Sequence, residues 1–237
     1  MEFKTDAIVI RAIDYKENDK LLTLFTPSRG KVTAGIKGVR KPKAKLNFAA
    51  QPFCFAEYVL SEKAGRYTVT SAYLYDGFFA LRTDIERYYA ACAALEICNA
   101  LLMEEEGSEG TFIAVVECLK TLALTDSDPA ECLLTFALQA LRESGYPVDL
   151  DGCGICGSDV GETPYFDFEF GFFTCKECAQ GERASRSTYE LLRKCEGLEH
   201  GETGGGNKRG LRLIKAYLAQ KTEEEYPCFG EFLRLYE

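Results

Sequence analysis

Four cysteines in the middle of the chain are arranged as two Cys-x-x-Cys pairs. Cys153 and Cys156 form the first pair, and Cys175 and Cys178 form the second after eighteen intervening residues. This spacing is typical of a structural zinc site. Four thiolates complete the tetrahedral shell of one Zn²⁺ and leave no position for water, so such a metal stabilises structure and performs no chemistry. The sequence predicts one structural zinc here, and two free dithiols or a redox pair are the alternative.

The segment between the two pairs is rich in aromatic residues. They alternate around Gly171 and comprise Tyr165, Phe166, Phe168, Phe170, Phe172 and Phe173. A period of two that a glycine interrupts is typical of a hairpin. A module this short buries too little apolar surface to fold unaided, and metal binding would supply the missing free energy.

Length and composition limit the class of protein. A chain of 237 residues allows one large domain or two to three small ones, and 46% apolar residues is ordinary for a globular protein. The first fifteen residues carry charges throughout and no apolar stretch of signal-peptide length. No segment approaches the roughly eighteen apolar residues of a membrane span. These features predict a cytoplasmic protein that has no contact with a membrane.

Seven further cysteines lie outside the two pairs. Disulfides are rare in the cytosol, and a thiol on the apolar face of a helix behaves as a small hydrophobe. We therefore expect unpaired, mostly buried thiols at Cys54, Cys92, Cys98, Cys118, Cys132, Cys195 and Cys228.

The net charge of −9 hides an asymmetry along the chain. Residues 1–80 carry +5, whereas the remaining 157 residues carry −14. No acidic residue occurs between Asp19 and Glu57, and basic residues are concentrated in that window. Basic residues gathered in one segment of an acidic protein indicate a polyanion-binding surface. The alternative is a solvated, positively charged loop that has no partner.

The first eighty residues have the pattern of a small β-barrel. Short alternating or apolar segments separated by turn residues predict five strands at 7–13, 20–26, 31–37, 53–61 and 66–73. Five strands without an intervening helix favour an oligonucleotide-binding (OB) barrel, which binds single strands with a cationic groove and aromatic stacking platforms. Candidate platforms are Phe25, Phe48, Phe53, Phe55, Tyr58, Tyr67, Tyr73 and Tyr75, most of which we expect in the core.

After residue 80 the apolar period changes to that of helices. Stripes at three-to-four spacing predict helices over 81–102 and 112–122. A third opens with Asp128 as N-cap and Pro129 at the first helical position, and stops at Gly145. A capping-box pattern from Ser187 to Glu190 predicts a fourth that closes at Gly197, and a last helical region covers about 209–220.

No catalytic constellation is apparent in the sequence. His200 is the only histidine and lies in a loop, so no Ser/His/Asp or Cys/His relay can be assembled around it. The glycine-rich segment 204–210 lacks the order of a phosphate-binding loop, and no strand precedes it. We therefore expect a protein that is not an enzyme and has no small-molecule substrate.

Taken together, several segments resemble the RecO family of bacterial recombination mediators. They are Ala7–Ile10, Asp14–Asp19, Leu24–Thr26, Gly30–Val32, Lys37–Lys41, Gln51–Phe53 and Gly145–Pro147, together with the four paired cysteines, which match the zinc-containing branch. They occur in the right order along the whole chain. One departure is Ala44, where the family often has a serine.

The resemblance implies a role in DNA repair. It implies annealing of complementary strands, and loading of recombinase onto single strands coated by single-strand-binding protein (SSB). It also implies binding of single- and double-stranded DNA, the partners RecR and SSB, and a nucleoid-associated place in the cytoplasm.

The expected architecture is α+β: a five-stranded OB-type barrel followed by a helical domain with an inserted four-cysteine zinc module. The expected bounds are 1–79 for the barrel, 80–147 for the first helical part, 148–183 for the zinc module and 184–237 for the second helical part. The zinc ligands are the four paired cysteines, Cys153, Cys156, Cys175 and Cys178.

The principal DNA-binding path is expected at Lys37, Arg40, Lys41 and Lys43, with Arg11, Lys31 and Lys45 assisting. The competing basic surface lies in the helical part, at Arg183, Arg186, Lys208, Arg209 and Arg212. A basic patch supplies mostly sequence-independent affinity by releasing counterions, and strand annealing requires no covalent chemistry. The alternative functions are a zinc-ribbon adaptor of transcription or translation, or an accessory subunit of a nucleic-acid enzyme.

Overall fold

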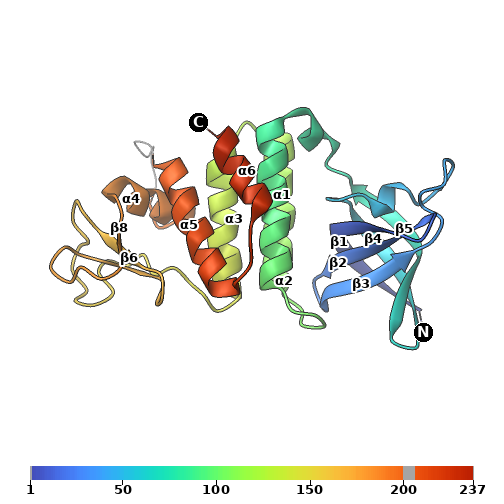
Figure 1. Ribbon diagram of the computed structural model, residues 1–237, viewed down its shortest axis with the longest axis horizontal. Helices are drawn as coiled ribbons and strands as arrows, with labels where there is room; N and C mark the ends of the chain where they lie inside the picture. Colours follow the sequence, from blue (N-terminus) through green and yellow to red (C-terminus); the bar gives the residue numbers. More distant parts are fainter. Residues whose placement is uncertain (1, 200–205, 237) are drawn as a thin grey trace.

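The computed structural model describes residues 2–199 and 206–236, in three parts that follow one another in space (Figure 1). A closed β-barrel stands at one end, a set of helices in the middle and a small three-stranded sheet at the other end. His200 lies outside the described residues. The α+β class predicted from the sequence is confirmed.

Five strands form the barrel, in the order β1-β2-β3-β5-β4. They are β1 (Glu2–Tyr15), β2 (Asp19–Thr26), β3 (Gly30–Ile36), β4 (Phe55–Lys63) and β5 (Arg66–Asp76). Strands β3 and β5 are parallel, and the other described neighbours are antiparallel. Closure removes both sheet edges, and this strand order is the one expected of the OB-type barrel. The interior is filled by Val9, Leu22, Leu24, Val32, Ala34, Ile36, Tyr58 and Leu60.

Strand β1 is twice as long as the apolar pattern predicts. Its first half pairs with β4, from Glu2 opposite Ser61 to Ile8 opposite Phe55. Its second half pairs with β2 and ends at Tyr15 opposite Asp19. The added residues, 2–6 and 14–15, are mostly polar, so the short apolar segment on which the prediction rests does not include them.

Six α-helices follow the barrel among the described residues. They are α1 (Ile85–Leu101), α2 (Glu109–Leu124), α3 (Pro129–Glu143), α4 (Arg186–Cys195), α5 (Asn207–Thr222) and α6 (Pro227–Leu235). The Asp128 carboxylate accepts from the Ala130 amide, so the predicted cap of α3 is confirmed. Helix α4 begins earlier than predicted, because Ser185 accepts from the Thr188 amide and is its cap.

Helix α6 was not predicted from the sequence. It packs along α1, and the Glu96 carboxylate of α1 accepts hydrogen bonds from the amides of Cys228 and Phe229 at 2.8 and 3.1 Å. A carboxylate at the start of a helix satisfies free amides and complements the helix dipole. A contact between residues 132 positions apart therefore determines where this short helix begins. None of the described helices is long and apolar enough to cross a membrane.

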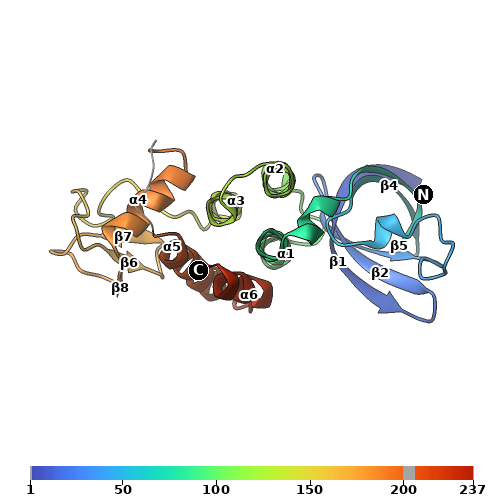
Figure 2. The same cartoon turned by 90° about the horizontal axis from the view of Figure 1, so that it is seen from above.

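The barrel and the helices share one apolar core. Phe25 of β2 packs edge-on against Phe112 of α2 with ring centroids 5.3 Å apart. Phe53, just before β4, packs in the same way against Tyr88 of α1 at 5.7 Å. Phe25 and Phe53 are completely buried, so one outer side of the barrel is covered by α1 and α2 (Figure 2).

The turn between β2 and β3 completes this junction. Gly30 has a φ of 55°, and a Cβ at this position would collide with the backbone carbonyls of Met103 and Glu106. The Lys31 amide donates to the Met103 carbonyl at 3.1 Å. Glycine is required here because the chain both adopts a left-handed conformation and touches the α1–α2 loop.

Replacing Gly30 by alanine tests this junction. Gly30→Ala adds the strain of a positive φ to a collision with backbone, and we expect a loss of about 3 kcal/mol in the free energy of unfolding. Gly65→Ala is the matched control, because Gly65 has a φ of 70° and no atom within 4 Å of the added Cβ. Its expected cost is about 1 kcal/mol. Equal costs in urea unfolding would contradict the account of the junction.

Candidate nucleic-acid interface and metal centre

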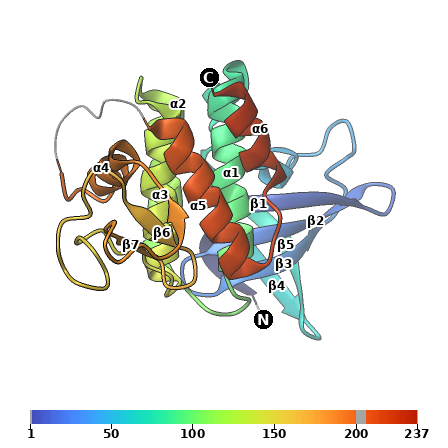
Figure 3. The same cartoon turned by 60° about the vertical axis from the view of Figure 1, so that its left-hand side comes forward.

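The basic segment after β3 is held against the β1–β2 hairpin. The Gly38 amide donates to the Asp19 carboxylate at 2.8 Å, and the Arg40 amide donates to the Asn18 carbonyl at 3.1 Å. We call residues 37–47 the basic loop. The hairpin and the basic loop project from the barrel on the side away from the helices (Figure 3). The loop therefore has a defined path along the end of the hairpin.

Arg40 contributes to this attachment with its side chain. Its guanidinium lies 3.2 Å from the Asp14 carboxylate and donates to the Lys16 and Glu17 carbonyls at 3.4 and 3.2 Å. Its donors are thus directed to the hairpin. Arg40 lies within the predicted DNA path, but the structure shows it holding the loop.

Four other basic side chains of the loop are free of such contacts. Lys37, Lys41, Lys43 and Lys45 are exposed, and none of them forms an ion pair or hydrogen bond with a described residue. Their charges point into solvent from a backbone that is held in place. This arrangement favours contact with a flexible polyanion.

Two residues predicted to assist lie apart from the loop. Lys31 donates to the Asn99 carbonyl near the C-terminal end of α1 at 2.7 Å, so its charge is used at the barrel–helix junction. Arg11 is exposed and lines a hollow of about 610 Å³ between the barrel, α1 and the start of α6, together with Glu96, Glu224 and Glu225. The structure therefore brings together five of the seven predicted residues and places these two elsewhere.

The predicted stacking residues are mostly unavailable. Phe25, Phe53 and Tyr58 are buried, and Phe48, Phe55 and Tyr67 are half-buried. Tyr73 and Tyr75 are exposed on β5, but the Tyr75 hydroxyl donates to the Asp6 carboxylate at 2.9 Å. Tyr15 is an exposed aromatic residue beside the basic loop, and it was not among the stacking residues predicted from the sequence.

The competing basic surface lies between β8 (Glu182–Arg183) and α5. Arg183, Arg209 and Arg212 line a hollow of about 640 Å³ whose apolar residues include Phe166, Phe168 and Leu213. Glu162 and Glu182 line the same hollow. Arg186 is removed from this set, because it pairs with Asp159 at 2.7 Å and with Glu190 at 2.8 Å.

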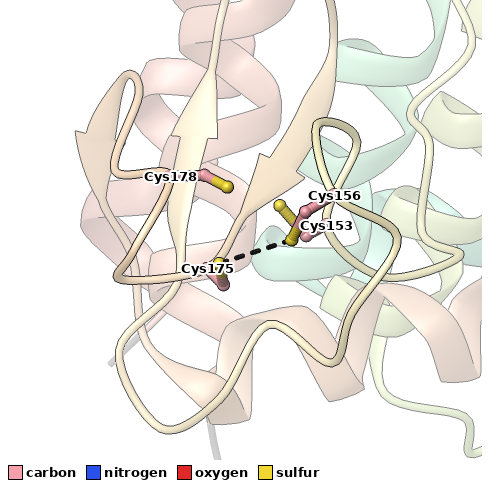
Figure 4. Close-up of side chains that lie close together, drawn as sticks. All are labelled: Cys153, Cys156, Cys175 and Cys178. Atoms are coloured by element: carbon pink, nitrogen blue, oxygen red, sulfur yellow. Dashed lines mark hydrogen bonds between the residues drawn. The ribbon is translucent and has the colours of Figure 1, made fainter.

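The four paired cysteines come together beside the small three-stranded sheet (Figure 4). Their Sγ atoms all lie within 4.8 Å of one another, and those of Cys156 and Cys175 are 3.8 Å apart. A tetrahedral zinc with bonds of about 2.3 Å requires sulfurs about 3.8 Å apart. The four thiols therefore fit the shell of one such ion. Within the described part of the chain, no other group of three or more His, Cys, Asp or Glu side chains is placed to hold a metal.

Both Cys-x-x-Cys segments adopt the same turn. The Gly157 amide donates to the Cys153 carbonyl at 2.8 Å, and the Ala179 amide donates to the Cys175 carbonyl at 2.9 Å. Burial alone would raise the pKa of the Cys153 thiol, but hydrogen bonds from the backbone of Cys156, Cys175 and Ile155 outweigh it and lower that pKa to about 6. The first turn therefore favours the thiolate of Cys153, which is the form that binds a metal. In the second pair, the hydrogen bond with the Cys156 thiol raises the pKa of Cys178 to about 12.

The cysteine-rich sheet is attached to the helices by aromatic packing. It consists of β6 (Tyr165–Asp167), β7 (Phe172–Thr174) and β8. Phe166 and Phe173 are fully buried, and pack edge-on against Tyr217 of α5 and Tyr189 of α4 respectively. The hairpin predicted around Gly171 is thus confirmed. The candidate metal site belongs to a platform that is continuous with the helices.

The other seven cysteines are free thiols in the structure. Cys54, Cys98 and Cys118 are buried, whereas the remaining four are half-buried. The Sγ atoms of Cys118 and Cys132 are 3.7 Å apart, which is a non-bonded contact.

Comparison with known proteins covers nearly the whole chain. Residues 1–78 match the family described as Recombination protein O N terminal, and residues 82–227 match Recombination protein O C terminal. The two matches correspond to the barrel and to the helices with the cysteine-rich sheet.

Individual relatives are named DNA repair protein RecO. The one from Desulforamulus reducens is 33% identical over 196 residues, which are 81% of this chain and 76% of that protein. The one from Acetivibrio thermocellus is 31% identical over 182 residues, 77% of this chain and 72% of that protein. The one from Anaeromyxobacter sp. strain K is 35% identical over 181 residues, 75% of this chain and 71% of that protein. Because these matches extend over the barrel and the helical part alike, the chain belongs to the RecO family.

Proposed function

We propose that this chain is a non-enzymatic mediator of DNA recombination and repair that binds DNA through its barrel. The observation that carries the proposal is the basic loop, whose exposed lysines project from a barrel of the OB type. Membership of a DNA repair family supports the same conclusion. The proposed path comprises Lys37, Lys41, Lys43 and Lys45, with Arg40 holding the loop to the hairpin.

Annealing is the activity that this surface suits best. Two complementary strands repel each other until their phosphates are neutralised, and lysines supply neutralisation without reading base sequence. No covalent step is required. By resemblance to the family, the proposed partners are single- and double-stranded DNA, RecR and SSB, and the proposed outcome is the loading of recombinase onto SSB-coated strands in the nucleoid.

The metal is proposed to be a single structural Zn²⁺. Four sulfur ligands favour zinc over hard cations, which prefer oxygen. Burial of Cys153 and Cys175 beside the aromatic core supports a structural role, because the site is continuous with the packing of β6 and β7 on α4 and α5.

A strand-annealing assay tests the proposed function directly. Purified protein should accelerate pairing of complementary oligonucleotides without a nucleotide cofactor, and a pull-down should retain RecR and SSB with and without DNA. A zinc-ribbon adaptor of transcription or translation would accelerate no annealing. An accessory subunit of a nucleic-acid enzyme would retain an enzyme in place of RecR.

Removing two lysines of the basic loop should weaken binding to all sequences alike. If four lysines neutralise about four phosphates, log affinity for single strands falls with log salt at a slope near −3. Lys41→Ala/Lys43→Ala should make that slope shallower by about 1.4, which lowers affinity roughly 25-fold at 0.1 M salt if binding is equal at 1 M. The measurement is fluorescence anisotropy of a labelled oligonucleotide over a salt series.

The matched variant Arg209→Ala/Arg212→Ala removes the same charge from the competing surface. We expect it to leave the affinity and the slope unchanged. Loss of binding in this variant, with wild-type binding in the lysine variant, would assign DNA to the hollow beside α5.

Replacing one zinc ligand should lower stability and metal content together. Cys153→Ser is expected to bind less than one zinc per chain and to lose about 4 kcal/mol in the free energy of unfolding, because the metal supplies folding free energy to the sheet. Cys195→Ser is the control, since this half-buried thiol lies outside the cluster. Metal analysis and urea unfolding are the measurements. Freshly purified, reduced wild-type protein without zinc would refute the proposal.

A further inference from the structure

Tyr15 is an exposed aromatic side chain at the end of β1. Its side chain is 44% exposed, and its ring has the Lys16 ammonium 5.2 Å from its centroid. Apart from this cation, the described part of the structure gives the ring no aromatic neighbour and the hydroxyl no hydrogen-bond partner. Nucleobases stack on aromatic side chains that a protein exposes beside a cation, and Tyr15 has both features.

The pleat of β1 separates Tyr15 from its neighbour Asp14. Asp14 lies 3.2 Å from Arg40 and 3.9 Å from Lys20. Side chains alternate along a strand, so Tyr15 lies on the opposite face of β1 together with Ile13, which is 45% exposed. Ile13 pairs with Leu21 of β2, and both side chains are only partly covered. This face of the hairpin therefore has an apolar patch that ends at the tyrosine.

The basic loop begins directly beside this patch. Tyr15 pairs with Asp19, and the Asp19 carboxylate accepts the hydrogen bond from the Gly38 amide at 2.8 Å. Lys37 precedes that glycine and is exposed. The hairpin that carries the ring is thus tied to the segment that carries the lysines, and the two keep a constant relation to each other.

We propose that Tyr15 stacks on a base of single-stranded DNA whose neighbouring phosphates are held by Lys37, Lys41 and Lys43. This proposal rests on the proposed function, and it names the residue that distinguishes unpaired bases from paired ones. A lysine contacts phosphate in single- and double-stranded DNA alike, whereas the face of a ring can receive a base only after that base has left its stack. Tyr15 therefore favours single strands, and releases the product once the bases pair.

The other exposed tyrosines of the barrel are placed less favourably. Tyr73 lies on β5 with the Lys4 ammonium 5.7 Å from its ring, but Lys4 itself is paired with Glu57 at 2.9 Å. Tyr75 donates to Asp6. The Glu57 and Asp6 carboxylates beside these rings repel a phosphate backbone. The Asp19 carboxylate opposite Tyr15 instead accepts the Gly38 amide at the start of the basic loop. Tyr73 and Tyr75 are therefore suitable negative controls.

A tryptophan probe tests the stacking directly, because the chain contains no tryptophan. In Tyr15→Trp the single indole should be strongly quenched when an oligothymidylate binds, since stacking on a base quenches indole emission. Tyr73→Trp is the control, because the tyrosine there is 61% exposed and the emission of its replacement should stay constant during the same titration. Binding without quenching at position 15 would overturn the proposal.

Affinity measurements separate stacking from charge. Tyr15→Ala should weaken binding to oligothymidylate about tenfold and leave the salt slope unchanged, whereas Tyr15→Phe should bind as the wild type does. An oligonucleotide of the same length made of abasic sites keeps the phosphates, so Tyr15→Ala and wild type should bind it equally, as they should bind duplex DNA.

Two further outcomes of these measurements are informative. Equal loss on abasic and thymidylate strands would show that Tyr15 acts only by positioning the loop, and would overturn the proposal. Failure of the proposed function is distinguishable, because the wild-type protein would then bind neither strand, or would lose binding in Arg209→Ala/Arg212→Ala and keep it in Lys41→Ala/Lys43→Ala.

Discussion

The apolar core shared by the barrel and the helices is the constraint on which the placement of every other part depends. Phe25 and Phe53 project outward from the barrel. They pack on Phe112 and Tyr88, so that α1 and α2 cover one side of the barrel. Gly30 brings the β2–β3 turn against the α1–α2 loop. The β1–β2 hairpin tip lies at the opposite end of β2, so the helices do not cover it. The core thus determines which end of the barrel the helices leave uncovered.

Arginine and lysine side chains have different roles within the basic loop. Arg40 has a planar group with several donors, and it is used to hold Asp14 and two hairpin carbonyls. The lysines carry compact charges on flexible stems, and they extend into solvent. A loop whose backbone is already fixed to the hairpin loses little entropy when its lysines bind phosphates. Positioning of the loop and the proposed binding of phosphate are therefore carried out by different neighbouring residues.

Much of this organisation could be predicted from local sequence. The cysteine spacing identified the four candidate ligands, and turn residues located the five strands. The sequence did not predict the features that depend on contacts between distant segments. Helix α6 is capped by Glu96, and Lys31 is bound to the end of α1, so neither is visible in a local pattern. Tyr15 was missed because the predicted strand ends at Ile13, whereas β1 continues to Tyr15 by pairing with β2.

The acidic charge of the rest of the chain favours the barrel as the part that a polyanion approaches. Residues beyond 80 carry −14, so a polyanion is repelled by most of the molecule and attracted to the barrel, which lies in the part that carries +5. Lysine contacts strong enough to hold duplex DNA would prevent release of an annealed product. In the proposed mechanism, a few free lysines and one ring that requires an unpaired base hold the DNA, and binding weakens as soon as pairing removes that base. Affinity and release are then set by the same small surface.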